Sequence, residues 1–404
     1  MSASEQPGGF IRGRIITGGS LIEDGIVAFA GDRIAYTGPA AGFNSPGWRE
    51  HEVPTGSVLL PGLIDTHCHG AYGADFTCGS AEAARTAIDY LHRSGTTTLL
   101  ASTVSAPRQD LVEAMDRLAA LAQEGLIAGI HAEGPFLSAT YRGSHDPGHL
   151  AAPDPGLVEE LVEASQGHLR SMTYAPELAG ADELVDLLTS HGITPSLGHT
   201  DCDDATAAAS LAHAAEGMAP VGFDGYSSRP TVTHLFNAMP PPHHRSPGPV
   251  AACLRAARSG QAAVELIADG VHLDPQMVLT VFELVGPENV ALVSDSCAAT
   301  GCGDGTYTLG GSKVSVAGGV ATLGGSLAAG TATLLDVLRG TVAAGVPLTD
   351  AVTAATTVPA AILGLVDEVG SLHPGYSADV LVATAGLELV AVLRQGEWLP
   401  APPA

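Results

Sequence analysis

The chain has 404 residues, and 45% of them are hydrophobic, so it can bury a large core and is not expected to be disordered. Its 43 Asp and Glu residues and 17 Lys and Arg residues give a formal net charge of −26. Partners such as nucleic acids or anionic membranes are not expected, because their binding requires a basic face.

Targeting signals and cysteine pairs are not evident in the sequence. The N-terminal residues MSASEQPGGF contain neither a basic start nor an apolar stretch, so no secretory signal is predicted. No apolar stretch reaches the roughly 18–20 residues that a membrane span requires. The six cysteines form no CxxC pair and are interpreted as reduced thiols. We therefore expect a cytoplasmic protein.

The pattern of the chain changes twice. Residues 1–57 and 367–404 contain short apolar runs separated by Gly-rich turns, which predicts two parts of one small β-sandwich. Residues 58–366 alternate between strand-like and helical runs. The strand-like runs are 58–69, 96–103, 126–134, 168–178, 193–200, 231–239, 262–272 and 289–296. Eight strand–helix units favour an α/β fold with a (β/α)8 TIM barrel. A doubly wound open sheet is the alternative, and it would need fewer units.

Polar residues follow the apolar body of several of these strands, where a barrel enzyme keeps its active site. His67 and His69 end the first strand and point to the same face, because they are two residues apart. Two such imidazoles can bind one divalent ion, although the motif alone fits a structural role equally well. Glu133 ends the third strand; on its own it would be interpreted as a solvated loop residue.

Three further candidates end later strands. His199 and His234 end the fifth and sixth strands, and a single histidine in such a place is more often a core or loop residue than a ligand. Two at successive strand ends, together with Glu133, favour a metal site. Asp295 ends the eighth strand and is placed to move protons as a general acid and base.

Nitrogen and oxygen donors without thiolates suit Zn²⁺, with Fe²⁺, Mn²⁺ or Co²⁺ as alternatives, and either one or two ions. Such an ion lowers the pKa of water, which predicts a hydrolase. A lysine carbamate between two ions is excluded, because the single lysine of the chain, Lys313, follows the eighth strand.

The motifs PGLIDTHCHG, HAEGPF, GHTD, THLFNAM, IADGVH and SDS, in this order, and the C-terminal GYSADVLV resemble the amidohydrolase superfamily over roughly residues 58–385. Within it, they resemble the N-acetylglucosamine-6-phosphate deacetylases. The resemblance implies that Glu133, His199 and His234 hold the principal metal and that Asp295 donates and accepts the proton. His67 and His69 match members with a second metal. The implied substrate-binding residues are Ser144, His145, Asn237, Ala238, Arg245, Asp269, His272, Leu323, Gly324 and Gly325.

The resemblance further implies hydrolysis of N-acetylglucosamine 6-phosphate to glucosamine 6-phosphate and acetate, by a homodimer, with Arg245 on the phosphate. A galactosamine epimer or a cyclic amide is the alternative substrate, and a non-catalytic barrel is the alternative from another class. The segment 217–230 is longer than the family pattern, and we expect it to reach either the active-site mouth or a subunit interface.

Overall fold

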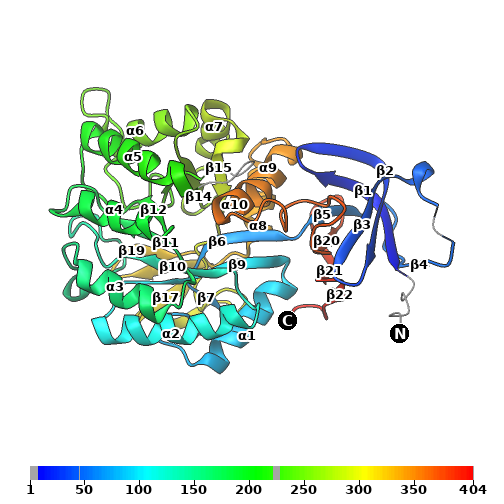
Figure 1. Ribbon diagram of the computed structural model, residues 1–404, viewed down its shortest axis with the longest axis horizontal. Coiled ribbons are helices and arrows are strands. Elements are labelled where there is room, and N and C mark those ends of the chain that lie inside the picture. The colour runs from blue at the N-terminus through cyan, green and yellow to red at the C-terminus, as the bar shows by residue number, and fades with distance from the viewer. Residues whose placement is uncertain (1–7, 45, 222–227, 404) are drawn as a thin grey trace.

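The computed structural model describes residues 8–44, 46–221 and 228–403, which form a barrel with a smaller β domain at one end (Figure 1). Neighbouring barrel strands pair in parallel. The strands, in their spatial order, are β6 (Leu63–Cys68), β9 (Thr96–Thr103), β10 (Gly129–Glu133), β11 (Leu169–Tyr174), β12 (Thr194–Leu197), β13 (Thr231–Val232), β14 (Ala263–Leu266) and β15 (Val290–Leu292). The backbone N–H of Asp295 donates to the carbonyl of His67 at 2.9 Å, which brings the end of β15 against β6 and nearly closes the barrel.

One helix follows each barrel strand, as the alternating pattern predicts. They are α1 (Ala81–Arg93), α2 (Arg108–Gln123), α3 (Pro155–Ala164), α4 (Ala181–Ser190), α5 (Asp204–Met218), α6 (Gly248–Arg258), α7 (Pro275–Val285) and α8 (Leu334–Ala343). In α1 the side chain of Ser80 caps the N-terminus, and Ala84, Ala87, Ile88 and Leu91 form the buried face. The predicted TIM barrel is therefore confirmed. None of the helices among the described residues has the length and apolarity to cross a membrane.

The small domain is one sheet built from both ends of the chain. Its strands are β1 (Gly9–Thr17), β2 (Ser20–Ala30), β3 (Arg33–Pro39), β4 (Arg49–Glu50), β5 (Val58–Pro61), β20 (Val380–Ala383), β21 (Leu389–Arg394) and β22 (Glu397–Trp398). Strand β5 lies between β1 and β20 and so joins the two ends. The sheet is curved, and the backbone N–H of Ile34 in β3 donates to the carbonyl of Tyr376, just before β20. The curved sheet surrounds a hydrophobic core that includes Ile11, Val27 and Val380.

The expected single strand over 58–69 is wrong, because it divides at Gly62 into β5 of the small domain and β6 of the barrel. The N–H of Gly62 donates to Asp379 in the small domain, whereas the N–H of Leu63 donates to Gly95 in the barrel. The backbone passes so close to Thr97 that a Cβ at position 62 would collide with its side chain. A glycine is therefore required where the chain changes sheets.

A four-stranded antiparallel sheet, which the sequence pattern did not predict, follows β15. It consists of β16 (Gly305–Leu309), β17 (Ser312–Ala317), β18 (Val320–Leu323) and β19 (Ser326–Ala329). Two hydrogen bonds fix it to the barrel: Gly310 N–H donates to Asp75 at 3.0 Å, and the Ser144 hydroxyl donates to the carbonyl of Ala328 at 3.1 Å. This added sheet covers one side of the barrel mouth.

The remaining elements are short. The pair β7 (Gly70–Ala71) and β8 (Ala74–Asp75) follows β6, and α9 (Leu348–Ala355) and α10 (Thr357–Leu363) follow α8. Single 3-10 turns are η1 (Ala40–Gly42), η2 (Pro147–His149), η3 (Ala219–Val221) and η4 (Pro287–Asn289).

Candidate active site and metal centre

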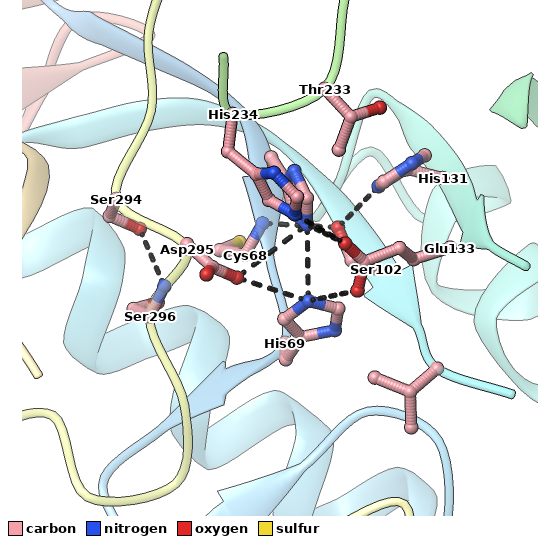
Figure 2. Close-up of polar contacts among 12 residues, drawn as sticks. Cys68, His69, Ser102, His131, Glu133, Thr233, His234, Ser294, Asp295 and Ser296 are labelled. Carbon is pink, nitrogen blue, oxygen red and sulfur yellow. Dashed lines mark hydrogen bonds and ion pairs between the residues drawn. The ribbon is translucent and has the colours of Figure 1, made fainter. Parts of the chain in front are cut away.

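The six strand-end candidates converge at the carboxyl end of the barrel strands, and all of them are buried. Figure 2 shows His69, Glu133, His234 and Asp295 among them. Glu133, at the end of β10, lies in the middle of the cluster. Its Oε1 is 3.0 Å from Nε2 of His199 and 2.9 Å from Nε2 of His234, and its Oε2 is 3.2 Å from Nε2 of His69. Burial raises the pKa of Glu133, but the surrounding imidazoles, His67 and His199 first, outweigh burial and hold the pKa well below its usual value. Glu133 is therefore a carboxylate.

The four cluster histidines form two close pairs. Nε2 of His67 is 3.1 Å from Nε2 of His69, and Nε2 of His199 is 3.1 Å from Nε2 of His234. The other ring nitrogen of His199 donates to the carbonyl of Tyr141 at 2.9 Å. Because a carbonyl can only accept, the proton of His199 is on Nδ1, and its Nε2 lone pair faces the cluster.

The donor set fits a divalent metal ion. Ligand atoms of His67, His69 and Glu133 lie within 4.8 Å of one another. The ligand atoms of a second group, Glu133, His145 and His199, also lie within 4.8 Å of one another. Imidazole lone pairs that converge on a carboxylate, with the far ring nitrogen fixed by a hydrogen bond, are characteristic of metal ligands. Nδ1 of both His69 and His234 is buried without a hydrogen-bond partner among the described residues, so no protein acceptor at Nδ1 fixes the tautomer of either ring.

His145 is a hydrogen-bond donor to Glu133. Its Nδ1 accepts the backbone N–H of Ser105 at 3.2 Å, so its proton is on Nε2, which donates to Oε2 of Glu133 at 3.1 Å. Burial lowers the pKa of His145 to about 4, so the ring is neutral. This geometry orients the carboxylate that the other histidines share.

Asp295 approaches the cluster from the opposite side to Glu133 (Figure 2). Its Oδ1 is 3.2 Å from Nε2 of His69 and 3.5 Å from Nε2 of His67. Burial raises the pKa of Asp295, yet the hydrogen bond from His69 and the nearby imidazoles outweigh burial and lower its pKa. The carboxylate is thus ionised and able to accept a proton at neutral pH.

The backbone turns sharply where the strands end. His199, His234 and Asp295 have φ values of +48°, +27° and +47°, in the left-handed region that residues other than glycine rarely occupy. Such strain is concentrated at functional sites, where surrounding structure maintains it.

A cavity of about 90 Å³ opens beside the cluster. Five of the expected substrate residues line it, namely Ser144, His145, Asn237, Ala238 and His272. Asp269 lies behind His272, and its carboxylate accepts a hydrogen bond from Nδ1–H of His272 at 2.8 Å. Nε2, the other ring nitrogen of His272, takes no part in this hydrogen bond. The apolar side of the cavity comes from Val104 and from the added sheet.

The other expected substrate residues lie apart from this cavity. Arg245 is exposed, and its guanidinium contacts Nε2 of His244 at 2.8 Å. Leu323, Gly324 and Gly325 form the end of β18 and the turn after it, whereas the added sheet lines the cavity with Leu309, Leu327 and Ala328. The central residues 222–227 of the long segment 217–230 lie outside the described residues.

Two polar residues of the site were missed because they lie within strands. Glu265, in β14, accepts a hydrogen bond from Nδ1 of His67 at 3.1 Å. His131, in β10, contacts Ser102 through Nδ1 at 3.0 Å and Thr173 through Nε2 at 2.8 Å. The available signal was a charged residue in an otherwise apolar barrel strand, AAVELIA, because a buried carboxylate requires a partner.

Comparison with known proteins identifies the family of the chain. A family model described as the amidohydrolase family matches residues 58–399. The N-acetylglucosamine-6-phosphate deacetylase of Bacillus subtilis (strain 168) is 32% identical over 393 residues, which cover 95% of this chain and 94% of the relative. The N-acetylgalactosamine-6-phosphate deacetylase of Escherichia coli O157:H7 is 31% identical over 346 residues, which cover 84% of this chain and 87% of that one.

A solved structure has the same architecture. The N-acetyl-D-glucosamine-6-phosphate deacetylase of Mycobacterium smegmatis, in complex with N-acetyl-D-glucosamine-6-phosphate, superimposes with a TM-score of 0.87 and 34% identity. The match covers 98% of this chain and 100% of that one. The chain therefore belongs to the amidohydrolase family and, within it, to the family of the N-acetylglucosamine-6-phosphate deacetylases.

Proposed function

We propose that the protein is a metal-dependent deacetylase that hydrolyses the acetamide of N-acetylglucosamine 6-phosphate to glucosamine 6-phosphate and acetate. The observation that carries this proposal is the convergence of three imidazoles of the cluster, Glu133 and Asp295 on one cavity, in a chain that is 32% identical to such a deacetylase over 95% of its length. N-acetylgalactosamine 6-phosphate is the second candidate substrate, because a relative named for that activity matches at 31% identity.

Glu133, His199 and His234 would hold the principal ion, and His67 and His69 would complete a site for a second one. Zn²⁺ suits this set of nitrogen and oxygen donors best. A bound divalent ion would polarise the acetamide carbonyl and lower the pKa of water.

Asp295 is the general base and acid of the proposed reaction. Its ionised carboxylate lines the cavity, where it removes a proton from the water that attacks the acetamide carbon. The C–N bond then breaks, and Asp295 returns the proton to the nitrogen of the leaving amine. His272, fixed through Nδ1 by Asp269, binds the sugar from the rim of the cavity, together with Asn237.

Arg245 is proposed as the phosphate contact, which requires its exposed side chain to reach a bound substrate. It lies in the loop between β13 and α6, on the side of the barrel where the strands end, and its guanidinium contacts the imidazole of His244. A guanidinium fork fits phosphate oxygens well. Leu323, Gly324 and Gly325 are proposed to contact the substrate from the turn after β18.

The test is acetate release from N-acetylglucosamine 6-phosphate, its galactosamine epimer and the unphosphorylated sugar, with metal content measured on the same samples. We expect turnover of a phosphorylated sugar only. Arg245→Ala should raise KM for that sugar by about 10–100-fold, as expected for a lost charge-assisted contact. The matched control is Arg258→Ala, an exposed arginine at the far end of α6, which should leave KM unchanged. A metal-loaded protein that releases no acetate from either sugar phosphate would contradict the proposal.

The proposal also includes a homodimer in the cytoplasm. The six free cysteines are consistent with a reducing compartment. Light scattering of the purified protein tests the dimer, since it gives the mass in solution directly, and a mass near the 40.7 kDa of one chain would rule it out.

A further inference from the structure

One buried carboxylate beneath the metal centre has no part in the proposed reaction. Glu265 belongs to β14, only 5% of its surface is exposed, and its strand neighbours Val264 and Leu266 pack in the hydrophobic core. Because side chains alternate along a strand, Glu265 faces the opposite side, the interior of the barrel. A charge in this position is costly unless hydrogen bonds compensate for it.

The carboxylate of Glu265 connects the two histidine pairs. Its Oε2 accepts Nδ1–H of His67 at 3.1 Å and the backbone N–H of His234 at 3.3 Å. The rings of His67 and His234 stack on each other, with centroids 5.5 Å apart. This oxygen atom thus contacts one residue of each pair, namely the side chain of His67 and the backbone of His234.

That contact decides where His67 carries its proton. With Nδ1–H donated to Glu265, the Nε2 lone pair of His67 faces the cluster and can bind a metal. Without this acceptor the proton is favoured on Nε2, because Oε1 of Glu133 and Oδ1 of Asp295 both lie 3.5 Å from that nitrogen and would accept it. His67 would then be lost as a ligand.

The other pair does not depend on Glu265 in this way. The tautomer of His199 is fixed by the backbone carbonyl of Tyr141, which no side-chain substitution removes. In the His67–His69 pair, Nδ1 of His69 has no partner among the described residues, so the only far-side acceptor found for that pair is Glu265.

We propose that Glu265 is a positioning residue that sets the affinity of the His67–His69 half of the centre for a second divalent ion and leaves the Glu133–His199–His234 half nearly unaffected. The inference rests on the metal binding in the proposed function, and it does not depend on which sugar is the substrate.

The test is titration of the metal-free protein with Mn²⁺, in which electron paramagnetic resonance reports the coupling of two neighbouring ions and elemental analysis gives the stoichiometry. We expect two equivalents for the unaltered protein. Glu265→Gln should weaken one equivalent by about 10–100-fold, the usual effect of altering a hydrogen-bond partner of a metal ligand, because an amide oxygen is a weaker acceptor than a carboxylate and the amide can turn its NH2 group toward His67. The spin coupling should disappear, and the affinity for the other equivalent should stay within about threefold.

Two further variants separate positioning from charge. Glu265→Asp keeps the charge and withdraws the carboxylate from His67, so it should lose the second equivalent as well. Asp379→Asn removes a buried carboxylate of the small domain and should change neither equivalent. In a His67→Gln background, Glu265→Gln should have no further effect on metal binding, since the two residues act as one unit.

A single equivalent in the unaltered protein, equal weakening of both equivalents by Glu265→Gln, or additive effects of the His67 and Glu265 substitutions would each overturn the inference. Acetate release is measured on the same samples. A protein with the expected metal binding but no deacetylase activity would overturn the proposed substrate and leave the role of Glu265 intact.

Discussion

Asp295 and Glu133 are carboxylates at opposite sides of one cluster, and their surroundings give them different roles. Imidazole nitrogens surround Glu133 at about hydrogen-bond distance, and His145 donates a further hydrogen bond to it. Both carboxylate oxygens of Glu133 therefore already have partners within the cluster. Asp295 contacts His67 and His69 on one side and lines the cavity on the other. The residue that can exchange a proton with a bound molecule is therefore Asp295.

Replacement of this carboxylate tests its role. Asp295→Asn keeps the shape of the side chain and removes its basicity, so kcat for the phosphorylated sugar should fall by about 10²–10⁴-fold, the usual contribution of general acid–base catalysis. Steady-state kinetics with elemental analysis checks this, and metal content should stay above half of the unaltered value. Ser296→Ala, next along the chain, is the control and should retain activity. More than a tenth of the original kcat in a metal-loaded Asp295→Asn would exclude the role.

At the scale of elements, much of the fold and part of the site follow from local patterns. The period of two places His67 and His69 on one face of β6, and apolar runs that end in a polar residue locate Glu133, His199, His234 and Asp295. The added sheet was missed, because its strands β16–β19 are short and Gly-rich and follow no barrel period.

The partners of the buried polar residues could not be predicted either. Glu265 and His67 are 198 positions apart, and only the closed barrel brings them together. The placement of Arg245 outside the cavity likewise depends on the path of its loop, which no local pattern encodes.

The junction between β5 and β6 should tolerate no side chain. Gly62→Ala introduces a Cβ against the Oγ1 and Cγ2 atoms of Thr97, so the free energy of unfolding should fall by about 1–3 kcal/mol. Urea denaturation measures this change. The control Gly386→Ala places a Cβ at ordinary contact distance, 3.7 Å from Thr384, and should change stability little. Adding Thr97→Ala to the Gly62 variant should restore part of the loss; no restoration would show that the collision is not the cause.

His92, in the C-terminal turn of α1, is a titratable residue that connects this helix to the backbone of the following barrel units. His92 contacts the carbonyls of Thr96 at 2.8 Å and Leu126 at 2.9 Å. Burial, with a contribution from Arg394, outweighs these two carbonyl contacts, which favour the protonated ring, and lowers the pKa of His92 to about 4. In the unfolded chain His92 has its ordinary pKa of about 6.5, so between pH 6.5 and 4 the unfolded state binds more protons than the folded state.

Stability should therefore fall as the pH is lowered through this window. The contribution of His92 is fully present above pH 6.5 and should decrease by up to about 3 kcal/mol by pH 4. Urea denaturation at several pH values measures it, and the His92→Asn variant should show a correspondingly shallower slope. Identical slopes for both proteins would contradict the low pKa of His92.

At the scale of the whole molecule, acidic residues strongly outnumber basic ones, and the formal net charge is −26. The 17 Lys and Arg residues are too few to neutralise the 43 acidic residues, even though many arginines form ion pairs, as Arg108 does with Asp154 and Glu160. Self-repulsion of this kind destabilises the compact state and is screened by salt.

Thermal stability should consequently rise with ionic strength. Between about 10 mM and 500 mM NaCl the Debye length falls from about 30 Å to about 4 Å, and we expect Tm to increase by about 2–5 °C. Differential scanning calorimetry measures the shift, and choline chloride should give the same result if screening is the cause. A Tm that stays constant or falls would contradict a destabilising surface charge.

The position of β5 between β1 and β20 has a consequence for biosynthesis. Strand β5 ends at Pro61 and its partner β20 begins at Val380, so the ribosome makes nearly the whole barrel between them. At about 5–20 residues per second, the β5 edge waits on the order of tens of seconds for its partner. During that interval the nascent chain exposes one unpaired edge of an apolar strand that is directly attached to β6, the strand that carries His67 and His69. Completion of the small domain, and firm anchoring of the first metal-binding strand, are thus among the last events of folding.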